Sequence, residues 1–438
     1  MIRRKTTAIA AGLVILSILM LEYGSRPPHI SAGANGTRPA DQLSGSETDQ
    51  PPNEAFLYDV RRYGAVADGT TNDTAAIQAV IDMARPNGII TGGGRRYAVS
   101  KLHLKSNISF CDFYLRTVPY DGTTGEFYSP VTIGAYNDIE LRENIQIHNV
   151  HIDGARTYQT GIGATEDGGR HGFRIIGPVE DLWITNSSAT YCASDGLCLY
   201  RGIGMGSIQT YHDGIKHRVH VVNSRFDYNR RHGASGDTMR NVTFVDCTFN
   251  NNGTEINGGV TEGDRGCESN EGKFGNGFDL EEYNETDWFG EIAFVGCQFV
   301  VNARAGILVY SGSGVKANAM NFVPRGPIRL VGCVANRGVH NWPTAYEFTP
   351  SASANDLGIY FRDVQLIGCI SDAGLVRVRA TDRAKIIGGT FHGTGRYDIE
   401  LYQAARTWIT DLPVGTRVHQ EESTFVEDPP EATVKQGL

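Results

Sequence analysis

The sequence predicts an all-β protein built as a parallel β-helix, a solenoid of stacked coils, with an N-terminal capping helix. Three observations predict this fold: a short apolar pattern recurs nine times, glycine is abundant, and an amphipathic segment precedes the first repeat. Glycine accounts for 53 of the 438 residues, well above the usual ~7%. This excess favours many tight turns over long helices.

Each repeat has apolar residues at its second and fourth positions and a small or apolar residue at its seventh. The repeats begin at Asn107, Asn144, Asp181, Arg218, Asn241, Glu291, Pro327, Asp363 and Arg383. Alternation over four or five residues predicts a strand with one buried face. So short a strand cannot bury that face alone, whereas stacking one repeat on the next gives a continuous core. Loops of unequal length between repeats are compatible with a solenoid.

Four of the eight cysteines occupy the seventh repeat position: Cys247, Cys297, Cys333 and Cys369. Stacked coils would place them in one interior column, where cysteine packs as a small apolar residue. We therefore expect free thiols there, while one disulfide among Cys192, Cys198 and Cys267 remains open. The cysteines lack the clustered spacing of a zinc site, and no cofactor is predicted.

The N-terminus predicts export. Arg3, Arg4 and Lys5 precede an apolar run at 7–21, which has the length of a signal-peptide core. A signal peptide and a membrane anchor both remain open for residues 1–28. A disordered linker is expected at 29–54, the β-helix at 55–415 and a C-terminal tail at 416–438. The net charge of −9 argues against nucleic acid as a partner.

Residues 58–100 predict a short strand, a glycine-rich turn and a helix whose N-cap is Asn72 or Asp73. The helix has an apolar stripe, formed by Ala76, Ile77, Val80 and Ile81. Pro86, Asn87 and Gly88 end it. An amphipathic helix at this point would cap the open end of a solenoid.

This segment resembles the opening of the pectate-lyase-like superfamily, which includes polygalacturonases, rhamnogalacturonases and phage depolymerases. The matching residues are Asp59-Val60, Tyr63-Gly64-Ala65, Asp68-Gly69 and Asn72-Asp73-Thr74. With the repeats, the resemblance covers residues 58 to about 395. It implies a right-handed parallel β-helix that acts on polysaccharide, and it leaves the reaction open.

A second strand is predicted after each central repeat, marked by a glycine at its start. Aligning Gly196, Gly233, Gly277 and Gly306 places the second and fourth residues after each glycine on the outward face. The candidate catalytic residues in the resulting patch are Asp195, His232, Asp237, Asp279 and Glu281. The candidate substrate-binding residues around it are Tyr200, Arg201, Lys216, Arg231, Glu282 and Tyr310.

The acids have spacings that suit glycoside hydrolysis. Asp279 and Glu281 would lie about 7 Å apart on one strand face, close to the ~6.5–9.5 Å of inverting glycosidases. Asp237 and Glu281 would be closer, near the ~5–5.5 Å of retaining enzymes. Neighbouring carboxylates raise the pKa of one of them, which suits a general acid. Acids on an outward sheet face can equally serve only to keep the surface soluble.

The resemblance to polygalacturonases in this region is partial. Ser194-Asp195-Gly196 and His232-Gly233 are similar to their Asn-Thr-Asp-Gly and His-Gly segments, but their paired aspartates on the intervening coil are missing. Three functions therefore remain open. The first is a glycoside hydrolase, and the second is a polysaccharide lyase or uronate epimerase, in which the acids could bind Ca²⁺. The third is a non-catalytic polysaccharide-binding protein.

Overall fold

A computed structural model of the chain divides into two units, Met1–Ala55 and Phe56–Leu438. All residues described below belong to the second unit: 56–119, 129–135, 139–156, 170–200, 216–254, 275–282, 289–311, 325–339, 343–350, 360–393 and 395–421. The predicted signal or anchor, the linker and Arg201 lie outside these ranges. In the described part of the chain, no helix is long and apolar enough to cross a membrane.

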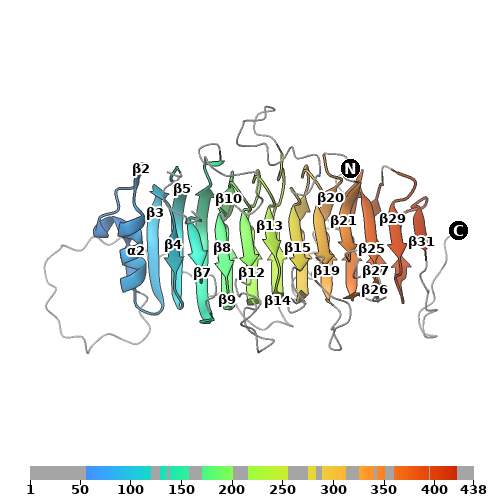
Figure 1. Cartoon of the computed structure of the whole chain (residues 1–438), viewed down its shortest axis with the longest axis horizontal. Helices are drawn as coiled ribbons and strands as arrows, with labels where there is room; N and C mark the ends of the chain where they lie inside the picture. The colour runs from blue at the N-terminus through green and yellow to red at the C-terminus, as the bar shows by residue number, and fades with distance from the viewer. Residues whose placement is uncertain are drawn as a thin grey trace, which may run out of the picture. The chain divides into compact units, whose positions relative to one another are not determined.

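The second unit is a right-handed parallel β-helix, as the sequence predicts. Its strands lie side by side from β3 to β31 in Figure 1. Sheet A follows the order β1 (Leu57–Asp59), β3 (Gly88–Val99), β5 (Ile108–Thr117), β7 (Arg142–Asp153), β9 (Val179–Thr185), β12 (Lys216–Val222), β14 (Met239–Val245), β16 (Phe289–Val295), β19 (Ile328–Val331), β23 (Val364–Ile367), β27 (Lys385–Ile387) and β30 (Trp408–Thr410). Two further strands join it, β2 (Asp68–Asn72) on β3 and β10 (Ser188–Thr190) on β7.

Sheet B forms a second wall of the solenoid. Its strands are β4 (Leu102–Leu104), β6 (Val131–Ile133), β8 (Phe173–Ile176), β11 (Leu197–Tyr200), β13 (Ala234–Gly236), β15 (Phe278–Glu282), β18 (Ile307–Ser311), β21 (Thr344–Thr349), β25 (Leu375–Arg379), β29 (Ile399–Tyr402) and β31 (Val418–Glu421). A smaller sheet contains β17 (Gln298–Phe299), β20 (Val334–Asn336), β24 (Ile370–Asp372) and β28 (Thr390–Phe391), and β22 (Phe361–Arg362) pairs with β26 (Thr381–Asp382).

The backbone conformation explains why the first and sixth positions of the repeat are mostly polar or glycine. The first residue of eight repeats has a positive φ: Asn107, Asn144, Asp181, Arg218, Asn241, Glu291, Asp363 and Arg383. The sixth residue has a positive φ in all nine: Asp112, Asn149, Asn186, Asn223, Asp246, Gly296, Gly332, Gly368 and Gly388. Asn, Asp and Gly tolerate this left-handed conformation better than other residues. The sixth position therefore marks the turn that ends the sheet A strands from β9 to β27, whereas β5 and β7 continue past it.

Inside the coils, phenylalanines stack in register beneath the central strands of sheet B. Phe244 stacks on Phe294 with ring centroids 4.9 Å apart, and Phe249 stacks on Phe299 at 5.0 Å. Phe278 of β15 meets both Phe244 and Phe249 edge-on. Because Phe278 directly precedes Asp279, this packing fixes the strand that carries the candidate acids.

The predicted cysteine column is present. Cys247, Cys297, Cys333 and Cys369 are buried free thiols, and each lies 3.4–3.5 Å from a carbonyl oxygen of the preceding coil. Cys192 and Cys198 are also free, so they form no disulfide with each other. Cys267, the third candidate for a disulfide, lies outside the described residues.

The two ends of the solenoid differ in how well they were predicted. Helix α2 (Thr74–Met83) follows the 3-10 turn η1 (Val60–Tyr63) and buries Ile77, Val80 and Ile81 against the core. Its N-cap residue is Asp73, whose carboxylate accepts the N–H groups of two residues in the preceding turn. The tail boundary at 415 needs correction, because β31 pairs with β29 and carries the solenoid on to Glu421.

Candidate functional site

The strand register of sheet B confirms the predicted alignment of the four glycines. Leu197, Ala234, Phe278 and Ile307 are direct partners on adjacent coils, so each glycine that precedes them occupies the same place. Leu197 also pairs with Phe173, which adds Gly172 to the series. The outward column that results contains Arg174, Cys198, Ser235, Asp279, Leu308 and Glu347.

Glycine is required at these strand starts because the next coil approaches closely. A Cβ atom at Gly233 would lie 2.6 Å from the Gly277 carbonyl oxygen and 2.7 Å from Asn252 Nδ2. Gly196 and Gly277 would meet the equivalent atoms of their own next coils at 2.5–2.8 Å. Real Cβ atoms do not approach backbone oxygens this closely, so the glycines allow the coils to stack tightly at the site.

Beside these glycines runs a column of buried asparagines, which we call the asparagine ladder. Asn229, Asn252 and Asn302 each accept, at 3.0 Å, a main-chain N–H from the preceding coil, donated by Cys192, Asn229 and Asn252 in turn. All three amides are fully buried or nearly so. The ladder satisfies main-chain donors in a turn where the sheet hydrogen bonds are interrupted.

A second column contains the residue immediately before each of these glycines, together with Ser129, which precedes Pro130. We call it the entrance ladder. Each side chain accepts the main-chain N–H of the equivalent residue on the next coil at 3.1–3.3 Å, through the series Ser129, His171, Asp195, His232, Asn276 and Ala305. The first five of these side chains are buried. The entrance ladder therefore performs the same task as the asparagine ladder, but three of its members are ionisable.

Asp279 lies against this entrance ladder. His232 Nε2 is 3.2 Å from Asp279 Oδ2, and Asn276 Nδ2 donates to Oδ1 at 3.2 Å. Burial, reinforced by the charge of Glu281, raises the pKa of Asp279 to about 8. Burial also lowers the pKa of His232 to about 3. At neutral pH the site thus holds a protonated carboxyl beside a neutral imidazole.

Glu281 lies two residues further along β15 and is partly exposed. Its partner on the next coil is Tyr310, whose pKa is raised by burial and by the Glu281 charge. Arg304 lies among these groups: burial lowers its pKa, while the charges of Asp279, Glu347 and Glu281 oppose that shift. The site therefore combines two carboxyl groups with a guanidinium and a phenol.

Asp195 is a buried anion rather than a proton donor. Its Oδ1 lies 3.6 Å from Arg231 Nε, and its Oδ2 accepts the Ser235 hydroxyl at 2.7 Å. Burial opposes ionisation, but the Arg231 charge and the hydrogen bond with His171 hold the pKa of Asp195 well below its usual range. Asp195 therefore compensates the buried Arg231 charge and orients its neighbours.

Two predicted site residues need correction. Asp237 lies just beyond the end of β13, is 2% exposed, and accepts the Thr238 N–H, so its carboxylate is engaged with the main chain rather than with solvent. Glu282 is completely buried, where it pairs with Arg325 and accepts the Tyr360 hydroxyl. Its carboxylate is satisfied inside the protein, away from the surface where substrate contact was predicted.

The remaining predicted binding residues fall in different places. Tyr200 ends β11 and is partly exposed, and Arg231 contacts Asp195 as described. Lys216 begins β12 in sheet A, so its strand does not belong to the sheet that carries the acids. Sequence reasoning missed His171, Arg174 and Arg304. Extending the alignment by one coil, to Gly172, would have found His171 and Arg174. Arg304 lies two residues before Gly306, outside the positions considered.

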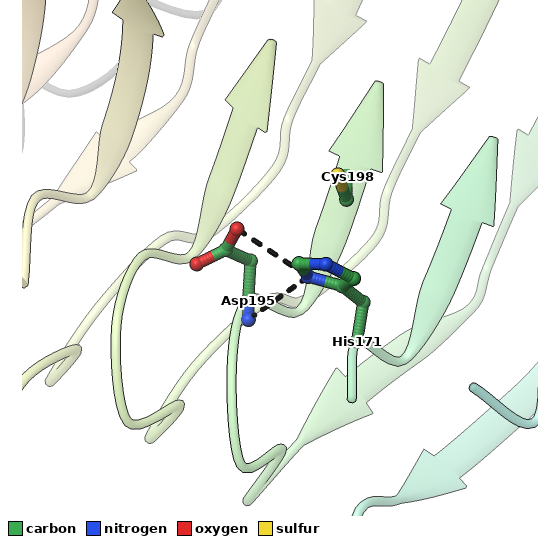
Figure 2. Close-up of side chains that lie close together, drawn as sticks. All are labelled: His171, Asp195 and Cys198. Atoms are coloured by element: carbon green, nitrogen blue, oxygen red, sulfur yellow. Dashed lines mark hydrogen bonds and ion pairs between the residues drawn. The ribbon is translucent and has the colours of Figure 1, made fainter. Parts of the chain in front are cut away.

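One group among the described residues offers donor atoms of the kinds that bind metal ions. Atoms of His171, Asp195 and Cys198 lie within 4.8 Å of one another, and all three side chains are buried. Figure 2 shows the imidazole beside Asp195, with the Cys198 side chain above the ring. His171 Nδ1 lies 3.4 Å from Asp195 Oδ2 and accepts the Asp195 N–H at 3.3 Å.

No family model matches the chain, and no curated protein matches its sequence significantly. Among solved structures it is similar to the A-module of the mannuronan C-5 epimerase AlgE4 from Azotobacter vinelandii, with 15% identity, a TM-score of 0.50, and coverage of 84% of this chain and 100% of that one. It is also similar to PfbA, a surface adhesin of Streptococcus pneumoniae, with 14% identity, a TM-score of 0.53, and coverage of 85% and 90%.

A polygalacturonase from Erwinia carotovora aligns over 89% of this chain and 100% of its own, at 10% identity and a TM-score of 0.46. The chain therefore has the right-handed parallel β-helix fold. At these identities the likenesses show the fold alone, since one fold can carry unrelated functions.

Proposed function

We propose that the protein is a glycoside hydrolase that cleaves an acidic polysaccharide by inversion. The observation that carries the proposal is the pKa of Asp279, raised to about 8 beside the partly exposed Glu281 on the same strand face. A carboxyl that stays protonated at neutral pH is the general acid that glycoside hydrolysis needs. Its ionised neighbour supplies the base.

In this mechanism Asp279 protonates the glycosidic oxygen, while Glu281 takes a proton from the attacking water on the opposite side of the sugar. Two residues on one strand face are separated by about 7 Å, which leaves room for that water. His232 and Asn276 orient the Asp279 carboxyl from the entrance ladder. They act through Asp279 and are positioning residues.

The acidic nature of the substrate follows from the charges around the acids. Arg231 and Arg304 both act electrostatically on Asp279 and favour its ionised form. A uronate carboxylate bound beside them would offset their charge and keep Asp279 protonated. AlgE4 is a mannuronan epimerase and PfbA an adhesin, so the fold is found in both enzymes and binding proteins. We further propose that the protein is exported, with residues 1–28 as its signal peptide or anchor.

Incubation with a panel of acidic polysaccharides tests the proposal. We expect new reducing ends, and we expect Glu281→Gln to lower kcat by roughly 10²–10⁴-fold, the usual contribution of a general base. Glu180→Gln is the matched control, because Glu180 lies on β9 of sheet A, where it pairs with Arg218. Full activity of Glu281→Gln would exclude the assigned base. Retained binding without any cleavage by the wild type would support a purely binding protein.

One arrangement favours a second candidate, a lyase or uronate epimerase. His232 is neutral and lies near Arg231, and Tyr310 lies beside Glu281, so a base and a cation are both present for abstraction of a proton next to a carboxylate. Elimination would produce an unsaturated uronate with ultraviolet absorbance. Hydrolysis produces reducing ends without that absorbance. If cleavage were lost on removal of Ca²⁺ with a chelator, the acids would be metal ligands rather than the acid–base pair.

A further inference from the structure

We propose that Cys198, His171 and Asp195 form a second reactive centre, in which Cys198 is a thiol nucleophile for carboxylic esters. The three residues come from adjacent coils: His171 precedes β8, and Asp195 and Cys198 bracket the start of β11. Their arrangement is that of a nucleophile, a base and a group that orients the base. The inference that a sugar carries the ester rests on the proposed function. The inference that Cys198 is a reactive thiol does not depend on it.

The imidazole lies close to the thiol. One donor atom from each of the three side chains lies within 4.8 Å of the other two. In the imidazolium form Nδ1 no longer accepts the Asp195 N–H and donates instead toward Asp195 Oδ2, which lies 3.4 Å away. Burial opposes protonation of His171, but the negative charges of Cys198 and Asp195 outweigh it and raise its pKa to about 9. An imidazolium at this place stabilises a thiolate.

Cys198 differs from the other cysteines in its surroundings. It lies in the outward column of sheet B, 8% exposed, between Arg174 and Ser235 on the neighbouring coils. The column cysteines point into an apolar core instead. His171 and Arg174 interact with the thiol, and Asp195 lies within 4.8 Å of it. Tyr200 acts on Arg174, and Arg231 and His232 act on Asp195. Reactive cysteines occupy partly accessible, electropositive sites of this kind.

A metal ion would fit this site less well than a nucleophilic thiol. Asp195 already has a guanidinium 3.6 Å from Oδ1 and a hydroxyl on Oδ2, and the Arg174 charge interacts with Cys198. The two guanidinium charges would repel a metal cation at this place. The same positive charge from Arg174 would stabilise an oxyanion that forms on a carbonyl at Cys198.

The reaction balances with water as the only co-reactant. The thiolate attacks the ester carbonyl, the carbon–oxygen bond to the alcohol breaks, and the His171 imidazolium gives its proton to the departing alkoxide. A thioester on Cys198 results. His171 then takes a proton from water, the hydroxide attacks the thioester, and the carboxylic acid leaves as the thiolate and the imidazolium are restored.

Alkylation of the intact protein with iodoacetamide, followed by peptide mass spectrometry, tests the thiol. At about pH 6.5, where a free thiol is roughly 1% ionised, we expect Cys198 to react while Cys192 on the same coil does not. His171→Gln should slow alkylation of Cys198 by about 10-fold. An unreactive Cys198 in the folded protein, or equal rates in the His171 variant, would overturn the proposal.

Hydrolysis of p-nitrophenyl acetate and of an O-acetylated polysaccharide tests the catalytic step. Cys198→Ala and Cys198→Ser should each lose at least about 10²-fold of ester turnover, and the wild type should show an acetylated Cys198 by mass. Glu281→Gln should retain ester turnover, which separates failure of this inference from failure of the glycosidase. If the Cys198 variants kept full turnover, or if the wild type bound one Co²⁺ with a thiolate charge-transfer band, the site would not be a nucleophile.

Discussion

The asparagine ladder and the entrance ladder run side by side along the start of sheet B, and both satisfy main-chain N–H groups between coils. The asparagine ladder does so with neutral amides at Asn229, Asn252 and Asn302. The entrance ladder uses two histidines and an aspartate for equivalent bonds. Buried ionisable groups cost more free energy than amides unless they are compensated. Since Asn276 shows that an amide serves in the entrance ladder too, we propose that its ionisable members serve the site rather than the fold.

Exchanging one member of each ladder should separate these roles and give the largest effects. His232→Asn keeps an acceptor for the Asn276 N–H, as Asn276 itself provides for the next coil, but it removes the group 3.2 Å from Asp279. We expect glycosidase activity to fall about 10–100-fold, with stability changed by about 1 kcal/mol or less.

Asn252→Ala should do the opposite. It leaves buried donors of Asn229 without their acceptor, so the free energy of unfolding should drop by at least about 2 kcal/mol, while the folded protein stays active. Denaturant titration and initial rates measure both variants. If His232→Asn were as destabilising as Asn252→Ala and fully active when folded, the functional reading of the entrance ladder would be wrong.

Some features of the two ladders can be recognised from local sequence patterns and others cannot. This difference explains what could be predicted. The repeat, the capping helix, the cysteine column and the glycine alignment follow from local periodicity, and the structure confirms them. Asp279, Glu281, His232 and Asp195 follow from counting outward or entrance positions from those glycines. His171 was missed because the count began one coil too late, at Gly196.

The errors arise where a strand ends or a distant partner intervenes. Asp237 was assigned outward by alternation, but β13 stops at Gly236, so alternation no longer applies. Glu282 was grouped with its neighbour Glu281, although adjacent residues of a strand face opposite sides. Its partners, Arg325 and Tyr360, lie far along the chain. No local pattern indicates such pairs, because coil stacking brings them together.

The titration of Asp279 predicts how the stability and the activity of the protein depend on pH. Its pKa is 3.8 in the absence of the fold and about 8 within it, so the folded protein holds a proton that the unfolded chain has already released. The stability this contributes is full below about pH 4 and lost as the pH rises to about 8. We therefore expect the Tm of Asp279→Asn to exceed that of the wild type increasingly between pH 5 and pH 9. Activity of the wild type should fall above about pH 8.

Glu281→Gln is a second test of the same titration. The Glu281 charge helps to raise the pKa of Asp279, so removing it should move the alkaline loss of residual activity to lower pH. Glu180→Gln on sheet A should leave the pH of that alkaline loss of activity unchanged. Parallel Tm curves for Asp279→Asn and the wild type from pH 5 to pH 9 would contradict a protonated Asp279.

The smallest effect is expected on sheet A, where the turn at the sixth repeat position depends on backbone conformation alone. Gly332 has a φ of 62°, and a Cβ atom added there would have nothing within 4 Å. Gly332→Ala should cost about 1 kcal/mol of stability, because a left-handed φ strains most side chains. Gly332→Asn should cost less, since asparagine tolerates that region and occupies the equivalent place at Asn186 and Asn223. Thermal melts of the two variants measure the difference. Equal losses would mean that packing, rather than the left-handed turn, selects the residue at this position.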